Sequence, residues 1–267
     1  MSTPQLDPYH SRTSPIHSLD ARVKLALALA LLFTIALVPA GALPVYPLLL
    51  ALVWSLAEIS ELGIGFILRR SWIALPFALA ALPVIFTLNG DPLFTLALGT
   101  WQITASSAGL ERFFGILFKA WCSVQVAALL AATTPQTQLL LALRWLHIPR
   151  LLVSIVGLMW RYLYLLVEES GRLMRARSSR SGASPDPAHR MGGTVVWRAR
   201  VTGGMAGSLM VRSLERSERV YAAMLARGYD GEIRTLPPPA LSGASRRLMA
   251  IGLLGCGLLL TLSIIWA

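Results

Sequence analysis

Long runs of apolar residues, separated by short polar segments, dominate this chain. Five runs approach the length of about 20 apolar residues that crosses a bilayer as an α-helix. They lie at residues 23–38, 43–59, 71–88, 113–132 and 248–266. A β-barrel would instead show short segments of alternating polarity. The pattern therefore predicts an all-α integral membrane protein with about five transmembrane helices.

These runs divide the chain into four segments. Residues 1–22 are polar and contain three prolines, so we expect a cytoplasmic N-terminal arm, with Asp20 capping the helix that follows it. Residues 23–136 hold the first four spans. Residues 137–235 mix apolar and charged positions and predict long amphipathic helices on the cytoplasmic side. Residues 236–267 hold the last span.

Basic residues orient the spans. Arg12, Arg22 and Lys24 surround the start of the first span, and Arg69 and Arg70 follow the second. Because cytoplasmic loops carry an excess of such residues, we expect the N-terminus and the loop after the second span to lie in the cytoplasm. We also expect Arg22 and Lys24 to contact lipid head groups. The loop between the third and fourth spans is expected to be irregular and outside.

The apolar run at 139–167 has two readings. It contains three arginines: Arg144, Arg150 and Arg161. One extra full crossing would place the arginine-rich region that follows it outside, against the charge rule. The run is therefore either a set of helices that dip into the membrane or lie along its inner surface, or a pair of crossings at 137–147 and 150–167. The first member of that pair is short for a crossing.

Two charged helices are predicted in the third segment. The first carries Glu168 and Glu169, which we expect to pair locally with Arg172, and it runs into Ser181. Residues 181–203 are rich in Gly, Ser and Pro and predict a loop. The second helix is predicted at 205–227.

The second helix is amphipathic. At about 100° per residue, one face is apolar and the opposite face is charged. The apolar face holds Met210, Leu214, Tyr221, Met224 and Leu225, and the charged face holds Arg212, Glu215, Arg216 and Arg219. Gly228 suits the left-handed position that ends a helix, so Arg227 is expected at a helix tip. A cation is favoured there.

Charge and composition exclude several classes of protein. The net charge is +11, but the chain is 55% hydrophobic and only 14% charged, and its arginine-rich stretch also holds acidic residues. This distribution favours a membrane-flanking role over nucleic-acid binding. The two cysteines lie in apolar runs and predict neither a disulfide framework nor a metal site. The polar start of the chain predicts no cleavable signal peptide.

The chain carries no HExxH, GxSxG or Walker A motif, so we expect no catalytic, cofactor-binding or metal-binding residues. Any ATP would be hydrolysed by another chain. The alternative from a different class is an integral membrane enzyme that acts on lipid, with arginine clusters that bind phosphate head groups.

Three segments carry a resemblance to a known family. Residues 14–25 are similar to an H-x-L-D-P-R-x-K-L entry to the first span, with Ala21 in place of proline. Residues 143–149 are similar to the segment that leads into coupling helices, and residues 226–231 to an Ala-Arg-Gly signature followed by an aromatic residue, Asp and Gly. On these residues the chain resembles the transmembrane T component of energy-coupling factor (ECF) transporters, closest to the cobalt-type CbiQ branch.

The resemblance implies two coupling motifs that dock on ATPases. Ala226, Arg227 and Gly228 match the second motif. The first is degraded: Ser179, Arg180 and Ser181 occupy its position, and Arg177 is the competing assignment for its arginine. The resemblance implies supporting roles for other residues of the two helices: Arg177, Arg216, Arg219, Met210, Leu214 and Tyr221.

The resemblance also implies the partners. Two ATP-binding cassette subunits would hydrolyse ATP, and a separate substrate-binding membrane subunit of the cobalt type would carry the substrate. The chain itself would bind no cofactor and would contact membrane lipid but no nucleic acid. Its implied role is to transmit ATPase motion in the bacterial inner membrane, for uptake of cobalt that feeds cobalamin synthesis. Nickel and vitamin transporters of the same type are the alternatives.

Overall fold

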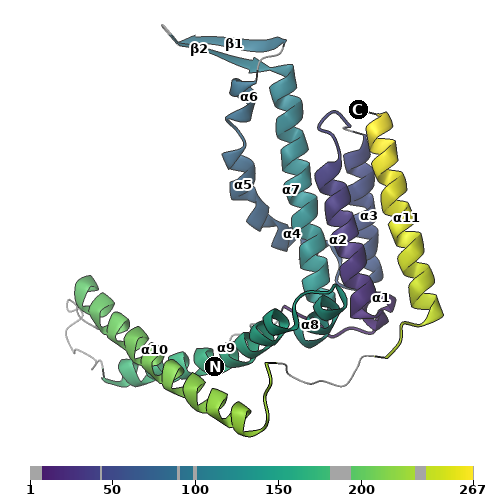
Figure 1. Ribbon diagram of the computed structural model, residues 1–267. Helices are drawn as coiled ribbons and strands as arrows, with labels where there is room; N and C mark the ends of the chain where they lie inside the picture. Colours follow the sequence, from purple (N-terminus) through teal and green to yellow (C-terminus); the bar gives the residue numbers. More distant parts are fainter. Residues whose placement is uncertain are drawn as a thin grey trace. The chain divides into compact units, whose positions relative to one another are not determined.

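The computed structural model of the chain describes residues 8–42, 44–88, 91–98, 101–180, 194–231 and 239–266. Most of these residues are helical (Figure 1). The described elements are α1 (Pro15–Ser18), α2 (Ala21–Leu37), α3 (Val45–Ile59), α4 (Ile64–Ser71), η1 (Trp72–Ala74), α5 (Leu75–Ala80), α6 (Val84–Thr87), β1 (Pro92–Leu98), β2 (Trp101–Ser106), α7 (Ser107–Thr133), α8 (Gln136–Trp145), α9 (Arg150–Arg180), α10 (Val195–Ala226) and α11 (Gly243–Ile265).

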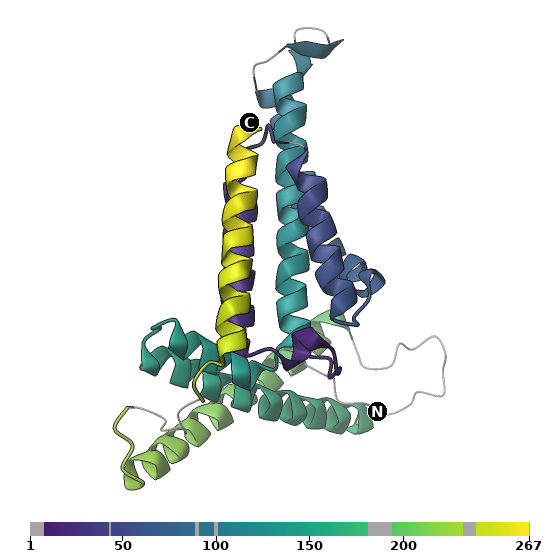
Figure 2. The ribbon, with the colours of Figure 1, turned by 90° about the vertical axis from the view of Figure 1, so that its right-hand side faces the viewer.

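The chain divides into two compact units. The described residues of Asp7–Trp145 and Pro238–Ala267 form the first, which we call the bundle unit. Those of Leu146–Pro237 form the second, which contains α9 and α10 and which we call the two-helix unit. Within the bundle unit, α2, α3, α7 and α11 run side by side (Figures 1 and 2).

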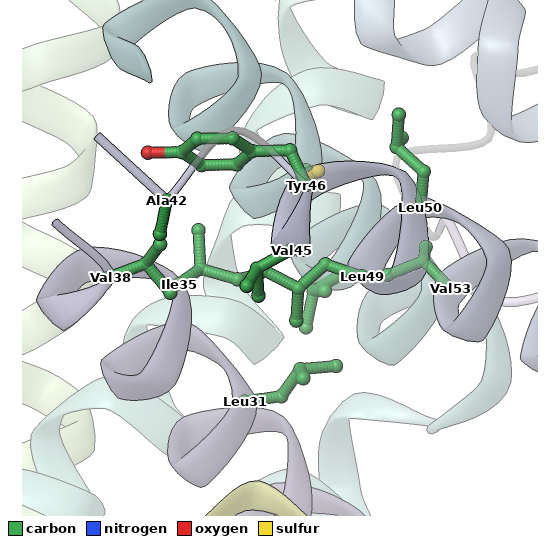
Figure 3. Close-up of a cluster of buried hydrophobic side chains, with 11 residues drawn as sticks. Leu31, Ile35, Val38, Ala42, Val45, Tyr46, Leu49, Leu50 and Val53 are labelled. Carbon is green, nitrogen blue, oxygen red and sulfur yellow. The ribbon is translucent and has the colours of Figure 1, made fainter. Parts of the chain in front are cut away.

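One apolar core joins the long helices of the bundle unit (Figure 3). Ile35 of α2 and Leu49 of α3 are fully buried in it, and Cys122 of α7 lies beside them. Leu259 of α11 packs against the same cluster. Between membrane helices such packing stabilises mainly through van der Waals contact, because lipid is as apolar as the side chains.

Three described helices are long and apolar enough to cross a membrane: α7, α9 and α11. The shorter α2 has 17 residues, or about 26 Å of helix at 1.5 Å per residue. The prediction of an all-α membrane protein is therefore confirmed. The predicted first, second and last spans correspond to α2, α3 and α11.

The prediction of one continuous third span at 71–88 is wrong. The chain there forms the last residue of α4 and three short helical pieces: η1, α5 and α6. Pro76 lies in the first turn of α5, and Pro83 is the N-cap of α6. Proline has no backbone N–H and its ring clashes with the preceding turn, so both positions interrupt the helix that their apolar neighbours favour.

The prediction of an irregular loop before the fourth span is also wrong. Strands β1 and β2 pair antiparallel, with Thr95 opposite Thr104. Helix α7 follows β2 directly and begins at Ser107, six residues before the predicted start of the span. The Ser106 hydroxyl accepts a hydrogen bond from the Gly109 N–H at 3.0 Å, which caps the helix.

The start of α2 confirms one prediction and contradicts another. The Asp20 carboxylate caps the helix by accepting from the Arg22 N–H at 2.9 Å, and the Arg22 guanidinium holds the pKa of Asp20 below its usual range. However, Arg22 and Lys24 do not reach toward lipid head groups. They are 8% and 6% exposed, and both donate to protein oxygens. A buried cation requires such partners.

The apolar run at 139–167 is divided between the two units. Helix α8 covers its beginning and ends at Trp145, and α9 starts at Arg150. Helix α9 continues without a break from the apolar residues into the predicted charged helix and ends at Arg180. The run therefore shares one 31-residue helix with the charged segment.

Candidate functional site

The two predicted arginine tips lie at the ends of α9 and α10. Helix α10 begins at Val195, ten residues before the predicted start. The Thr194 hydroxyl caps it by accepting from the Trp197 N–H at 3.3 Å, so the part of the predicted loop after residue 194 is helical. The rest of that loop, residues 181–193 with Ser181, lies outside the described residues.

A buried carboxylate joins the two helices. Glu169 of α9 lies 3.2 Å from Arg216 and 3.5 Å from Arg212, both on α10. Its side chain is 11% exposed, and that of Arg216 is 31% exposed. The predicted local pairing therefore holds for Glu168, which contacts Arg172 at 2.9 Å, and is wrong for Glu169. Arg216 faces α9 instead of lying fully on an outer charged face.

A second contact fixes the direction of the pair. The Arg177 guanidinium donates to the Thr202 hydroxyl at 3.0 Å. Together with the contact of Glu169 to Arg216, this makes the two helices antiparallel. The end of α9 therefore lies toward the start of α10, and Arg180 and Arg227 belong to opposite ends of the helix pair.

The end of α10 forms a two-bond turn around Gly228. The Gly228 N–H donates to Leu225 O at 2.9 Å, and the Tyr229 N–H donates to Met224 O at 3.0 Å. Gly228 has φ +78°. This is the hydrogen-bond pattern in which a glycine in the left-handed region closes a helix, as the sequence predicts. Arg227 sits on the last turn with its side chain exposed.

The end of α9 presents Arg180 in a similar way. Arg180 is the last helical residue and is exposed, whereas Arg177 is half-buried. The Ser179 hydroxyl is turned back onto its own helix, where it donates to Arg175 O at 3.0 Å. Arg180 and Arg227 are both exposed, so both guanidinium groups can meet an external acid.

An apolar groove of about 740 Å³ runs between α9 and α10. Leu158 and Tyr162 line it from α9, and Leu214, Tyr221 and Met224 line it from α10. Leu214 and Tyr221 keep more than half of their surface exposed. Met210, 65% exposed, borders a second, smaller groove beside it. The predicted apolar face of α10 is therefore open along most of its length.

The charged side of α10 is also exposed. Arg219 lies 4.0 Å from Glu215, and its side chain is 70% exposed. An exposed pair of this kind stabilises a helix by only about 0.3 kcal/mol. The pair therefore contributes surface charge more than stability.

Sequence reasoning missed the partner of Glu169, although a signal was present. Tyr162, Leu166, Glu169 and Leu173 follow one another at helical spacing. A carboxylate within an apolar stripe predicts a cation on the neighbouring helix. Arg172 lies on a different face of α9, where it pairs with Glu168.

Comparisons with known proteins place this architecture in a family. The sequence model of the family described as CbiQ, cobalt transport protein, matches residues 12–238. The chain is 28% identical over 159 residues to the cobalt transport protein CbiQ of Rhodobacter capsulatus, which covers 60% of this chain and 62% of that protein. This chain thus matches about three-fifths of the length of that relative.

Two further relatives have informative names. The energy-coupling factor transporter transmembrane protein EcfT of Brevibacillus brevis is 26% identical over 229 residues, or 82% of each chain. A fused cobalt transport protein, CbiMQ, of Methanocorpusculum labreanum is 24% identical over 225 residues, or 82% of this chain and 35% of that protein. In that relative, the matching region is part of a longer polypeptide.

Proposed function

Because the chain belongs to the CbiQ family of cobalt transport proteins, a family of transport permease components, we propose that it is the T component of an ECF-type importer. In this role it transmits the motion of ATPase subunits to a separate substrate-binding membrane subunit. One observation carries the proposal: two exposed arginines, Arg180 and Arg227, stand at opposite ends of one crossed helix pair.

The two ends suit two identical partners. An ATPase dimer offers the same acidic groove twice, and one helix pair with an arginine at each end can engage both grooves. Arginine suits this contact because its guanidinium stays charged and binds a carboxylate through two hydrogen bonds. Each arginine lies at a helix C-terminus, which carries partial negative charge. This charge stabilises the guanidinium at the helix end before docking.

The geometry favours Arg180 over Arg177 as the first docking arginine. Arg177 is half-buried and donates to Thr202 of α10, so docking through it would require that contact to break. Arg180 is exposed at the last position of the helix. We assign Ser179 and Ser181 to the flanks of the first motif, and Ala226 and Gly228 to those of the second.

The crossing point gives the helix pair a way to transmit force. When the ATPases close on ATP, the two tips are pulled together. Glu169, held between Arg212 and Arg216, resists separation of the helices at their crossing. Movement of the tips therefore changes the angle between the helices before it pulls them apart.

The open apolar face of α10 is the proposed seat of the substrate-binding membrane subunit. Met210, Leu214 and Tyr221 are exposed along it, and a flexible methionine side chain can repack as a partner moves. The fused relative named CbiMQ supports a membrane partner of the cobalt type. Arg216 and Arg219 support the helix, the first through Glu169 and the second by its surface charge.

Cobalt is the proposed cargo, and nickel or a vitamin is the alternative. In this proposal the chain itself holds neither metal nor cofactor, and ATP is hydrolysed in the partner subunits. The proposed location is the bacterial inner membrane, and the charge rule supports an N-terminus and a two-helix unit that face the cytoplasm.

The docking role is tested by charge reversal at one tip. We expect Arg227→Glu to reach the membrane in normal amount but to lose most of its ATPase on co-purification, because it places a carboxylate against an acidic groove. Arg227→Ala should lose less. The matched control is Arg247→Glu on α11, an exposed arginine that belongs to neither tip. Full ATPase recovery with Arg227→Glu would reject the docking role.

A further inference from the structure

The chain passes between the two units at two places that flank α9 and α10, which we call the first and second connections; a further passage, between Leu6 and Asp7, lies outside the described residues. The chain leaves the bundle unit between Trp145 and Leu146 and returns to it between Pro237 and Pro238. Helix α8 leads to the first connection, and the segment before α11 follows the second. A displacement of α9 and α10 is passed along the chain to α8 and α11 through these two connections.

Arg22 holds the segment just after the second connection. Its guanidinium donates to Pro239 O at 2.7 Å, two residues into the returning chain. Both oxygens of Asp20 fix the same guanidinium, with hydrogen bonds of 3.0 and 2.7 Å. Arg22 is only 8% exposed, so solvent offers its donors little replacement for these partners.

Lys24 holds the junction between α7 and α8, the helix that leads to the first connection. Its ammonium donates to Thr133 O at 2.9 Å and to His17 O at 3.1 Å. Thr133 is the last residue of α7, and α8 begins three residues later. The contact places a cation on a carbonyl at the end of a helix, where it is favoured electrostatically. Lys24 is 6% exposed, so this contact is also protected from water.

The sequence places these groups two residues apart on one helical turn. Asp20, Arg22 and Lys24 lie at the start of α2, and α2 also packs against α7, α8 and α11. One turn of α2 therefore binds the chain just after the second connection and at the start of the segment that leads to the first. Surface head-group anchoring would require exposed cations, and neither Arg22 nor Lys24 is exposed.

We propose that Asp20, Arg22 and Lys24 form an anchor that fixes the returning chain at Pro239 and the junction of α7 with α8 to the start of α2, so that movement of the two-helix unit drives the whole bundle. They are positioning residues for energy coupling, and this role rests on the proposed function. Without the anchor, the returning chain and the junction of α7 with α8 move independently of the start of α2. The tips still dock and the ATPases still turn over, but less of their motion reaches the membrane.

Hydrogen exchange on the full-length protein tests the anchor itself. In Arg22→Gln, we expect the amides of residues 246–250 in α11 to exchange about tenfold faster, the effect of losing one hydrogen bond to a charged group. In Lys24→Gln, the amides of residues 138–142 in α8 should respond in the same way. Arg12→Gln, which changes an exposed arginine of the same arm, should change neither. Unchanged exchange in both variants would overturn the anchor.

Measuring substrate uptake together with ATP hydrolysis tests the role of the anchor in energy coupling. The variants are compared in a complex reconstituted with the ATPase and substrate-binding subunits. We expect complex formation and ATP hydrolysis near the wild-type level, with substrate uptake per ATP hydrolysed reduced to less than half. A purely structural defect would lower assembly and hydrolysis together and would overturn the proposal. Asp20→Asn should reproduce Arg22→Gln, and Arg22→Lys, which keeps the charge but not the paired contact, should be intermediate.

The two experiments separate this inference from the proposed function. If the wild-type complex does not couple ATP hydrolysis to uptake, the proposed function fails, while exchange still shows whether the anchor exists. If the wild-type complex couples and the Arg22 and Lys24 variants couple equally well, the inference fails and the proposed function stands.

Discussion

At the scale of single residues, the end of α10 depends on the conformation of Gly228. Its φ of +78° lies in the left-handed region, which side chains other than glycine adopt at a cost. A Cβ there would meet no atom within 4 Å. The requirement for glycine is therefore one of backbone conformation, and no neighbouring atom contributes to it.

This predicts opposite effects for alanine at two glycines of the same region. Gly228→Ala should lower the free energy of opening of the last turn of α10 by about 1 kcal/mol, the cost of the left-handed backbone. Gly207→Ala, in the interior of α10 with equally open space, should raise the opening free energy of its turn by about 1 kcal/mol, because alanine favours helix. Amide exchange measures both. A neutral or stabilising Gly228→Ala would contradict the assigned turn.

The same residue scale explains why one docking arginine could be predicted and the other could not. The Arg227 tip follows from a local rule, since a glycine after an apolar periodicity marks a helix end. Arg177 and Arg180 lie three residues apart on one helix, and their spacing does not distinguish them. What separates them is Thr202, a residue of another helix, which only the packed structure brings into contact.

At the scale of elements, the crossing of α9 and α10 depends on one buried carboxylate. Glu169 is shared between Arg216 and Arg212, while Glu168 pairs with Arg172 on the exposed side of α9. Exposed pairs contribute little, whereas loss of one partner from a protected pair leaves a charge without compensation. Adjacent glutamates therefore have different energetic roles.

A double-mutant cycle tests this difference. Glu169→Gln and Arg216→Gln should each destabilise the helix pair by about 1–2 kcal/mol, with a coupling energy of about 1 kcal/mol between them. The control cycle, Glu168→Gln with Arg172→Gln, should give about 0.5 kcal/mol or less. Chemical denaturation of the full chain in detergent provides the free energies. Equal coupling in the two cycles would show that Glu169 does not hold the crossing.

Element prediction succeeded where apolar length alone decides the structure. Helices α2, α3 and α11 follow from runs without interruption. The prediction of a continuous third span is wrong because Pro76 and Pro83 interrupt the helix that the apolar pattern favours. The hairpin of β1 and β2 was not predicted because its two strands stabilise each other by pairing. The weak local preferences of each strand do not reveal this pairing. Arg22 and Lys24 were misassigned because a cation beside a span usually faces lipid, and the carbonyl groups of Pro239 and Thr133 that bind them are distant in sequence.

At the scale of the whole molecule, the two units have different kinds of stabilisation. The bundle unit has an apolar core shared by its long helices. The two-helix unit has a charged crossing and open apolar surface. A helix pair with so little internal packing is suited to change its crossing angle when partners bind its ends. In the proposed function, the two-helix unit transmits the motion and the bundle unit receives it.

Metal uptake tests the central claim most directly. Cells that express the chain with its partner subunits would be supplied with radioactive cobalt or nickel. We predict cobalt uptake with the wild-type chain, and its loss when both Arg180 and Arg227 are changed to glutamate, at equal membrane abundance. The double variant should remain in the membrane because neither residue contributes to the core. Undiminished uptake by the double variant would contradict coupling through the two helix tips.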